Sequence, residues 1–209
     1  ASKELEITLT GKNCGQEERA PMCGIPYHAA DSYLTKLVNK GYKVAICEQV
    51  EDPKLAKGIV KREVIRIVTP GTNLNMMSLE ESRNNYLMCI AYMEDKIGIA
   101  VVDALTGDFY VTEVSDTKKL NDEIVKFSPS EIICNDNFLV SGYSIDDLRE
   151  RLGISINKID AWHFEEDSCQ KLLCKHFKVN TLAGLGLEDF PSGMISAGAA
   201  MQYLLETQK

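Results

Sequence analysis

The sequence predicts an α/β protein of two domains, and three observations support that prediction. Its 209 residues exceed one average domain and suit two small ones. A Pro-Gly pair at 70–71, followed by the polar stretch 72–83, divides the chain. Beyond it, strand patterns in quick succession lead into alternating helices and a strand, an order typical of a mixed sheet covered by helices. We therefore expect a first domain at 1–70, a linker at 71–83 and a second domain at 84–209.

The first domain reads as a small mixed α/β unit. Alternating apolar and polar residues predict three strands, at 5–9, 42–47 and 60–69. Glycine and proline make 11–24 typical of an exposed loop, and 53–58 typical of a turn. Asp31 is the expected N-cap of a short helix. Tyr27 and His28, just before it, either contact a ligand or pack against that helix.

The second domain begins with an antiparallel meander. Short turns separate three predicted strands, at 86–93, 97–104 and 108–114. A helix from Asp116 follows, with apolar residues on one face, and then a strand at 131–134. Further helices are expected from Ser144, around 165–177 and at 192–207. A meander leading into a helix and a further strand is the opening of the ribonuclease H-like topology.

Composition and charge narrow the class of protein. Hydrophobic residues make up 44% and charged residues 26% of the chain, and no apolar run approaches the ~18 residues of a bilayer span. The N-terminus lacks the apolar stretch of a signal peptide, and without an initiator Met we expect the chain to be a fragment. Residues 1–72 carry 11 basic and 9 acidic side chains, whereas the remainder carries 12 and 22, for a net charge of −8. The acidic second part therefore argues against binding to DNA phosphates, and the first part permits it.

The sequence lacks the motifs of several common kinds of catalytic and binding site. The sequence has no G-x-x-x-x-G-K-[ST] phosphate loop, no G-x-S-x-G elbow and no H-E-x-x-H pair. Seven cysteines are scattered without a C-x-x-C pair, which favours reduced thiols in a cytoplasmic protein. The closest cluster is Cys169, Cys174 and His176, which a helix would point in different directions. We therefore expect no metal site and no catalytic group of these kinds.

One enzymatic alternative stays open, a metal-dependent nuclease of ribonuclease H-like fold. Asp103 ends a predicted strand near the place of that fold's first metal-binding carboxylate. Asp136 follows the strand at 131–134, and Asp122 or Glu123 on the intervening helix could join them. Asp103 also precedes the turn at 105–107, where aspartate is a common entry residue.

Six segments resemble the bacterial MutS family of DNA mismatch-repair proteins, in unbroken order over essentially the whole chain. They are 21–29 (PMCGIPYHA), 33–38 (YLTKLV), 44–49 (VAICEQ), 61–72 (KREVIRIVTPGT), 182–186 (LAGLG) and 199–204 (AAMQYL). The resemblance implies that 1–70 is the latter part of a mismatch-binding domain. It implies that 84–209 is a ribonuclease H-like connector domain without nuclease activity.

The resemblance also implies what this chain lacks. The family reads mismatches with a Phe-x-Glu pair in a G-D-F-Y-E segment, which is absent here. The stretch 107–111 (GDFYV) nearly spells it, but Val111 replaces the glutamate and the stretch falls in a predicted strand, so we expect Phe109 in the core. ATP and Mg²⁺ would bind a domain of the full-length, homodimeric protein that lies outside this chain.

The family suggests two sets of site residues. Lys12 falls where members often place a basic residue facing the DNA backbone. The connector domain of the family docks MutL, the next protein in the pathway, and Gln170 and Lys171 on the helix at 165–177 are candidates for that contact; a solvated helix face is the alternative. We expect the chain to be a non-catalytic scaffold in a cytoplasmic repair protein that acts on mismatched duplex DNA.

Overall fold

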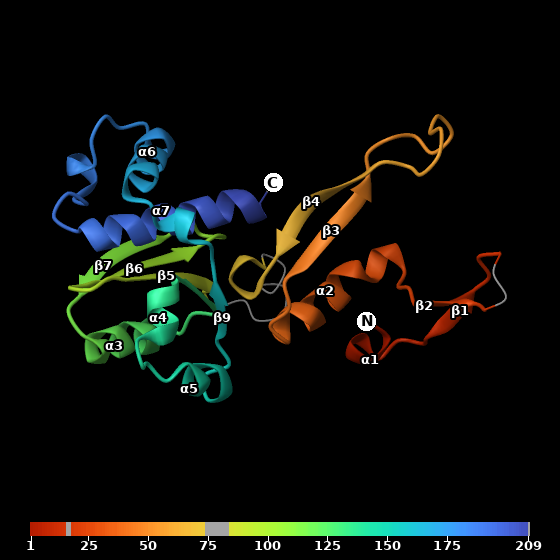
Figure 1. The fold of residues 1–209 in the computed structure, drawn as a ribbon, viewed down its shortest axis with the longest axis horizontal. Helices are drawn as coiled ribbons and strands as arrows, with labels where there is room; N and C mark the ends of the chain where they lie inside the picture. The colour runs from red at the N-terminus through yellow and green to blue at the C-terminus, as the bar shows by residue number, and fades with distance from the viewer. Residues whose placement is uncertain (16–17, 74–83, 209) are drawn as a thin grey trace.

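The computed structural model describes residues 1–15, 18–73 and 84–208, which form two units that meet at 69–73 (Figure 1). The predicted linker at 71–83 is described only as far as Asn73, because 74–83 lie outside the described residues. In that first stretch, η2 (Pro70–Thr72) is a buried turn rather than an exposed one. At 70–72, the segment that joins the two units is therefore buried and packed rather than an exposed linker.

The first unit is built around one helix and a long two-stranded arm. Helix α2 (Ala30–Asn39) lies against β3 (Val44–Gln49), which pairs antiparallel with β4 (Arg62–Val68). The predicted strands at 42–47 and 60–69 are thus confirmed. Its core is small: one cluster of three buried residues, Leu34, Val38 and Val68.

The N-terminal segment differs from the prediction. Residues 5–9 form no strand: α1 (Ser2–Leu5) is one helical turn, which Glu6 ends in the left-handed region at φ 56°. The chain then folds back, because the amide of Ile7 donates to the Ser2 carbonyl at 3.1 Å. The expected loop at 11–24 contains a hairpin of β1 (Thr10–Lys12) and β2 (Ala20–Met22).

The helix start was also predicted wrongly. Asp31 lies inside the first turn of α2, because a 3-10 turn, η1 (Tyr27–Ala29), leads directly into the helix. Tyr27 does not pack against α2, since 87% of the residue is exposed.

The second unit contains a five-stranded sheet in the order β7-β6-β5-β8-β9. Its strands are β5 (Tyr86–Tyr92), β6 (Ile97–Asp103), β7 (Phe109–Val114), β8 (Glu131–Cys134) and β9 (Ser155–Lys158). The first three form the predicted antiparallel meander, and β5, β8 and β9 run parallel. Strand β9 was not predicted, because only four residues of it pair and one of them is an asparagine.

Helices cover both faces of this sheet (Figure 1). One face packs against α3 (Thr117–Phe127), α4 (Asp136–Val140) and α5 (Ile145–Glu150). The other packs against α6 (Glu166–Phe177) and α7 (Pro191–Thr207), with short 3-10 turns η4 (Ala161–Phe164) and η5 (Ala183–Leu185) beside them. Asp116 caps α3 as predicted, accepting a hydrogen bond from the amide of Lys119. The short helix α4 was not predicted.

Helix α7 crosses the sheet at unusually close range. A Cβ on Gly98 of β6 would lie 1.8 Å from the Ser192 carbonyl oxygen, and one on Gly198 would lie 2.3 Å from Cβ of Cys169 on α6. Glu113 on β7 accepts hydrogen bonds from the amides of Ser192 and Gly193, at 2.7 and 3.2 Å, and thereby satisfies the start of α7. Both glycines therefore serve packing.

A junction cluster of five residues joins the two units, and Glu131 of β8 is its centre. Its side chain is fully buried. Oε2 accepts hydrogen bonds from the Thr69 hydroxyl at 2.5 Å and the Gly71 amide at 3.0 Å, and Oε1 accepts from Asn157 Nδ2 and the Tyr203 hydroxyl, both at 2.8 Å. The two oxygens thus bind donors from both units.

Substitution of Gly198 tests the packing of α6 on α7. We expect Gly198→Ala to lower the free energy of unfolding by about 1–3 kcal/mol, because the added methyl has no room beside Cys169. Urea denaturation measures this. Gly184→Ala is the control, since nothing lies within 4 Å of its added Cβ; an equal loss in both variants would contradict the close approach.

Candidate nucleic-acid interface

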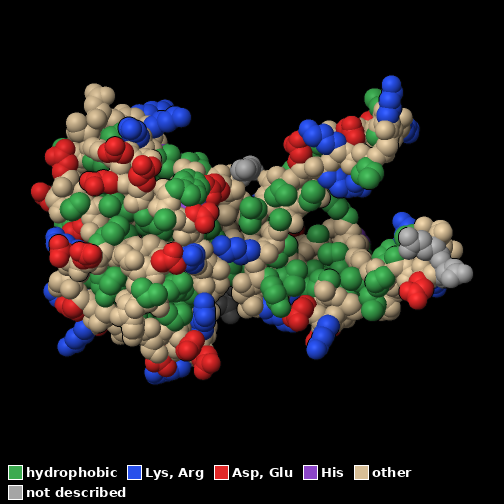
Figure 2. Space-filling model, in the orientation of Figure 1, with side chains coloured by type: hydrophobic (Ala, Val, Ile, Leu, Met, Phe, Trp, Pro, Cys, Tyr) green, Lys and Arg blue, Asp and Glu red, His purple; other side chains and the backbone are tan. Residues whose placement is uncertain are grey.

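Two projections of the first unit carry exposed basic side chains. One is the hairpin of β1 and β2; the other, which we call the arm, comprises β3, β4 and the segment 50–61 between them (Figure 1). Figure 2 shows Lys and Arg side chains distributed along the arm. Projections of this kind offer cationic groups to a polyanion without the cost of burying them.

Lys12 lies at the end of β1 and is exposed. It pairs in the ladder with Ala20, next to Arg19, whose guanidinium donates to the Gly11 carbonyl at 2.5 Å. Within residues 1–15, 18–73 and 84–208, no acidic side chain forms a salt bridge with Lys12. Its charge is therefore available to an external anion.

The segment at the end of the arm adds three exposed lysines, which we call the arm lysines: Lys54, Lys57 and Lys61. Among the described residues, Lys54 and Lys57 form no salt bridge, whereas Lys61 binds Glu63 at 2.7 Å. Glu63 raises the pKa of Lys61 through this hydrogen bond, and its own pKa is lowered in return. Solvent screens the pair, since both side chains are more than half exposed.

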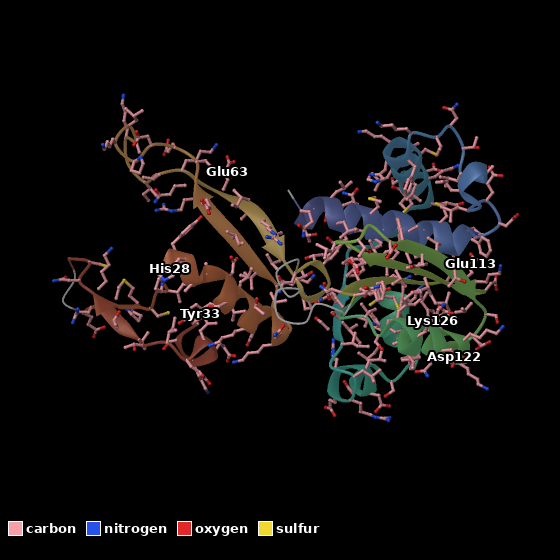
Figure 3. The ribbon with its side chains drawn as sticks, turned by 180° about the vertical axis from the view of Figure 1, so that it is seen from behind. His28, Tyr33, Glu63, Glu113, Asp122 and Lys126 are labelled. Atoms are coloured by element: carbon pink, nitrogen blue, oxygen red, sulfur yellow. The ribbon has the colours of Figure 1, made fainter. Side chains whose placement is uncertain are left out.

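Apolar side chains stand among the arm lysines. Leu55 is 80% and Ile59 92% exposed, which is unusual for aliphatic residues on such a charged segment. The sequence pattern predicts only a turn at 53–58 and no site in this region. Its signal was present, because four of the nine residues at 54–62 are basic. Figure 3 shows Glu63 on the arm, with His28 and Tyr33 on the body of the first unit.

The acidic residues of the nuclease alternative do not assemble. Asp103 pairs with Tyr86 at the start of β5, while Asp136 follows β8 at the other end of β5, about 20 Å away at strand rise. Oδ1 of Asp103 instead accepts the amides of Leu105 and Thr106, as at a turn entry. Asp136 binds Lys158 at 3.0 Å.

Two other acidic candidates lie on α3. Glu123 binds Lys126 at 2.9 Å, and Asp122 is exposed on the same helix (Figure 3). Among the residues that the structure describes, no group of three or more His, Cys, Asp or Glu side chains is arranged to hold a metal ion.

The cysteines offer no assembled site either. Burial raises the pKa of Cys134 to about 12 and that of Cys169 to about 11, so these thiols stay protonated near neutral pH. Cys169 faces the core beneath α6, whereas His176 is exposed on that helix. All seven cysteines are free.

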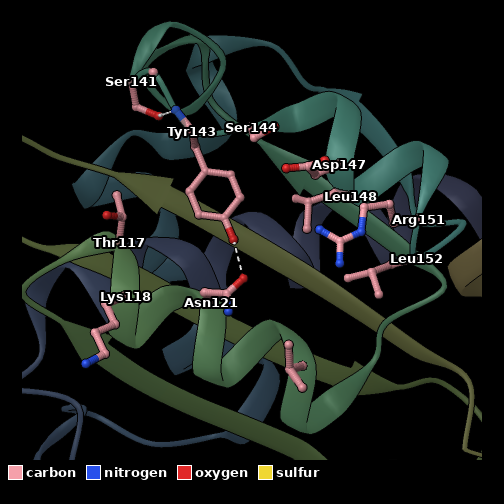
Figure 4. A pocket seen from close by; sticks show the side chains of 12 residues that line it. Thr117, Lys118, Asn121, Ser141, Tyr143, Ser144, Asp147, Leu148, Arg151 and Leu152 are labelled. Carbon is pink, nitrogen blue, oxygen red and sulfur yellow. Dashed lines mark hydrogen bonds between the residues drawn. The ribbon is translucent and has the colours of Figure 1, made fainter.

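The second unit contains a cleft of about 680 Å³ between α3 and α5 (Figure 4). The Tyr143 hydroxyl donates to Asn121 Oδ1 at 2.9 Å across it, and burial raises the pKa of Tyr143. Lys118, Arg151 and Asp147 lie on its walls. These charges do not converge on one point in Figure 4, so the cleft offers no assembled reaction centre.

The candidate partner residues are on the outer side of α6. Gln170 and Lys171 are exposed, whereas Cys169 and Leu173 on the same helix are buried against α7. Phe109 on β7, which was expected in the core, is partly buried: it packs against the core cluster, with its ring 6.4 Å from that of Phe177. It is therefore no exposed wedge.

Comparison with known proteins agrees with this architecture. A family model described as MutS domain I matches residues 1–76, and one described as MutS domain II matches residues 85–209. The chain belongs to the MutS family. The DNA mismatch repair protein MutS of Lachnoclostridium phytofermentans is 62% identical over 209 residues, which is all of this chain and 22% of that protein.

Other MutS relatives show the same extent of coverage. Those of Ruminiclostridium cellulolyticum and Acetivibrio thermocellus are 48% and 49% identical over 212 residues, which span this whole chain and 24% of each relative. The chain thus spans less than a quarter of the length of these MutS proteins. No helix in its described part is both long and apolar enough to cross a membrane.

Proposed function

We propose that this chain is the DNA-contacting and connecting part of a MutS protein that recognises mismatched duplex DNA. The observation that supports this most directly is the separation of charge. Lys12, Lys54 and Lys57 extend from the first unit without an acidic partner among the described residues, while residues 73–209 carry 12 basic and 22 acidic side chains. DNA would bind the first unit and avoid the second.

The second unit would be a non-catalytic connector with a ribonuclease H-like sheet. Its strand order β7-β6-β5-β8-β9, in which only β6 is antiparallel to β5, supports this proposal. The domain bounds would be 1–70 and 84–209. The distance between Asp103 and Asp136 disfavours a nuclease, because metal-dependent cleavage needs carboxylates around one metal site.

For the full-length protein, we propose that it binds ATP with Mg²⁺, forms a homodimer and is located in the cytoplasm. The residues of this chain do not fit such a nucleotide site. The sequence has no phosphate loop, and the described part has no group of acidic residues arranged for a metal ion.

Charge reversal on the two projections tests the DNA contact. We expect Lys12→Glu combined with Lys54→Glu and Lys57→Glu to weaken binding to a labelled duplex. The slope of log K against log salt should fall by about 0.9 for each lysine that contacts a phosphate. Fluorescence anisotropy at several salt concentrations gives both quantities for matched and G·T duplexes.

Lys171→Glu combined with Lys175→Glu and Lys178→Glu is the matched control, because it makes the same charge change on α6 and at its C-terminal end. An equal loss of affinity in this control would mean that net charge alone drives binding and would contradict the proposed interface. Because the Phe-x-Glu reading motif is absent, we expect no preference for the G·T duplex.

The outer side of α6 is the proposed docking surface for MutL. Lys171 and Gln170 present polar groups there, while the opposite side of the helix is buried. Such a contact leaves the arm free for DNA, so one chain could hold both partners.

Substitution on α6 tests this docking surface. We expect Gln170→Ala with Lys171→Glu to weaken MutL binding by about tenfold, in proportion to the loss of one or two good polar contacts. Surface plasmon resonance with full-length MutS carrying these changes measures the affinity. Lys54→Glu is the control, since it should weaken DNA binding and leave MutL binding unchanged. MutL binding that is unchanged in the Gln170→Ala, Lys171→Glu variant would contradict this docking surface.

A further inference from the structure

The root of the arm is held by the junction cluster. Strand β4 ends at Val68, and the next residue, Thr69, donates its hydroxyl to Glu131 Oε2 at 2.5 Å. Strand β3 begins at Val44, and the residue before it, Lys43, places its ammonium 5.0 Å from the ring centroid of Tyr203. Both strands of the arm are therefore held at the ends that lie nearest the second unit.

Tyr203 of α7 takes part in both contacts. Its ring faces the Lys43 ammonium, and its hydroxyl donates to Glu131 Oε1 at 2.8 Å. Burial and the neighbouring Glu131 carboxylate raise the pKa of Tyr203, so the hydroxyl keeps the proton that it donates. One side chain of the second unit thus contacts the arm directly through its ring and indirectly through Glu131.

The backbone of Gly71 lies so close to β5 and β8 that a side chain there would be crowded. A Cβ at this position would lie 3.0 Å from Cβ of Glu131 and 3.1 Å from Cβ of Leu87. Two further hydrogen bonds hold the same turn: Asn85 Nδ2 donates to the Pro70 carbonyl at 3.0 Å, and Gln208 Nε2 to the Thr72 carbonyl at 3.5 Å. The turn that connects the units is therefore both closely packed and held by directional hydrogen bonds.

We propose that Glu131 is a positioning residue: its buried carboxylate fixes the direction in which the arm leaves the second unit, and so holds the arm lysines in one place relative to α6. A fully buried carboxylate is stable only if it is fully hydrogen-bonded. Glu131 meets this condition only when Thr69 of the first unit and Gly71 of the adjoining turn η2 are docked. The purpose of this arrangement rests on the proposed function, since DNA would bind the arm and a partner would bind α6.

Hydrogen exchange followed by mass spectrometry on the 209-residue chain tests the inference without DNA or a partner. The positioning role of Glu131 can therefore be disproved while the proposed DNA contact stands, and the DNA contact can be disproved while the positioning role stands. We expect Glu131→Ala to raise amide exchange in peptides covering 69–73 by about tenfold or more, because the Gly71 amide loses its acceptor. Peptides covering 86–103 in the central strands should change less.

Glu131→Gln distinguishes positioning from bulk. With its nitrogen in the place of Oε1, the hydroxyl of Tyr203 can rotate and the amide of Asn157 can flip to accept, while Oε1 of the glutamine still receives Thr69 and Gly71. This variant should therefore keep more protection at 69–73 than Glu131→Ala. Equal exchange in the two variants would overturn a role for the hydrogen-bonding group.

Glu113→Ala is the matched control for Glu131→Ala, because Glu113 is also buried, with its side chain 3% exposed, and also accepts two amides, but only within the second unit. It should raise exchange at 192–195 and leave 69–73 unchanged. If Glu131→Ala fails to fold, Thr69→Val decides, since it removes one donor and keeps the shape. Unchanged exchange at 69–73 in the folded Glu131 or Thr69 variant, or an equal rise throughout the chain, would overturn the proposal.

Discussion

The four hydrogen bonds to Glu131 are the constraint on which the rest of the structure depends. A carboxylate without contact with water is destabilising by several kcal/mol unless every lone pair finds a donor. Its donors come from four separate places: the end of β4, the turn η2, β9 and α7. The charge is therefore satisfied only when the sheet, its covering helix and the first unit are all in place.

This dependence matters because the first unit has little core of its own. Three buried residues lie between α2 and a two-stranded arm, and an isolated pair of strands is marginal in water. The second unit buries apolar residues on both faces of five strands and supplies the rigid support. The basic projections can thus remain exposed and polar while their base is anchored in a dense core.

The sequence foretold the parts of the fold whose pattern is long and local. The meander and α3 follow from regular periodicity, and Asp116 does cap its helix. Short elements such as α1 and β9 were not predicted, because one helical turn or four strand residues are too few to show a hydrophobic period. Tertiary contacts, rather than propensity, decide those segments.

The candidate site was predictable in a similar, uneven way. Lys12 came from a family resemblance, and the arm lysines could have been found from their density in the sequence. Glu131 could not, because in the sequence it is one polar residue at the start of a short apolar strand. Its partners Thr69 and Tyr203 lie 62 and 72 residues away along the chain, and only the fold brings them together.

The distance between the arm and α6 tests the central claim most directly, namely that the junction cluster makes the two units one body. Cys47 on β3 is exposed, and Lys171→Cys adds a second label on α6 once Cys14, Cys23 and Cys174 are replaced by serine. Pulsed electron paramagnetic resonance between two spin labels reports the distribution of that distance. We predict one narrow distribution that broadens in Glu131→Ala. A distribution that is already broad with Glu131 in place, and that Glu131→Ala leaves unchanged, would contradict the account.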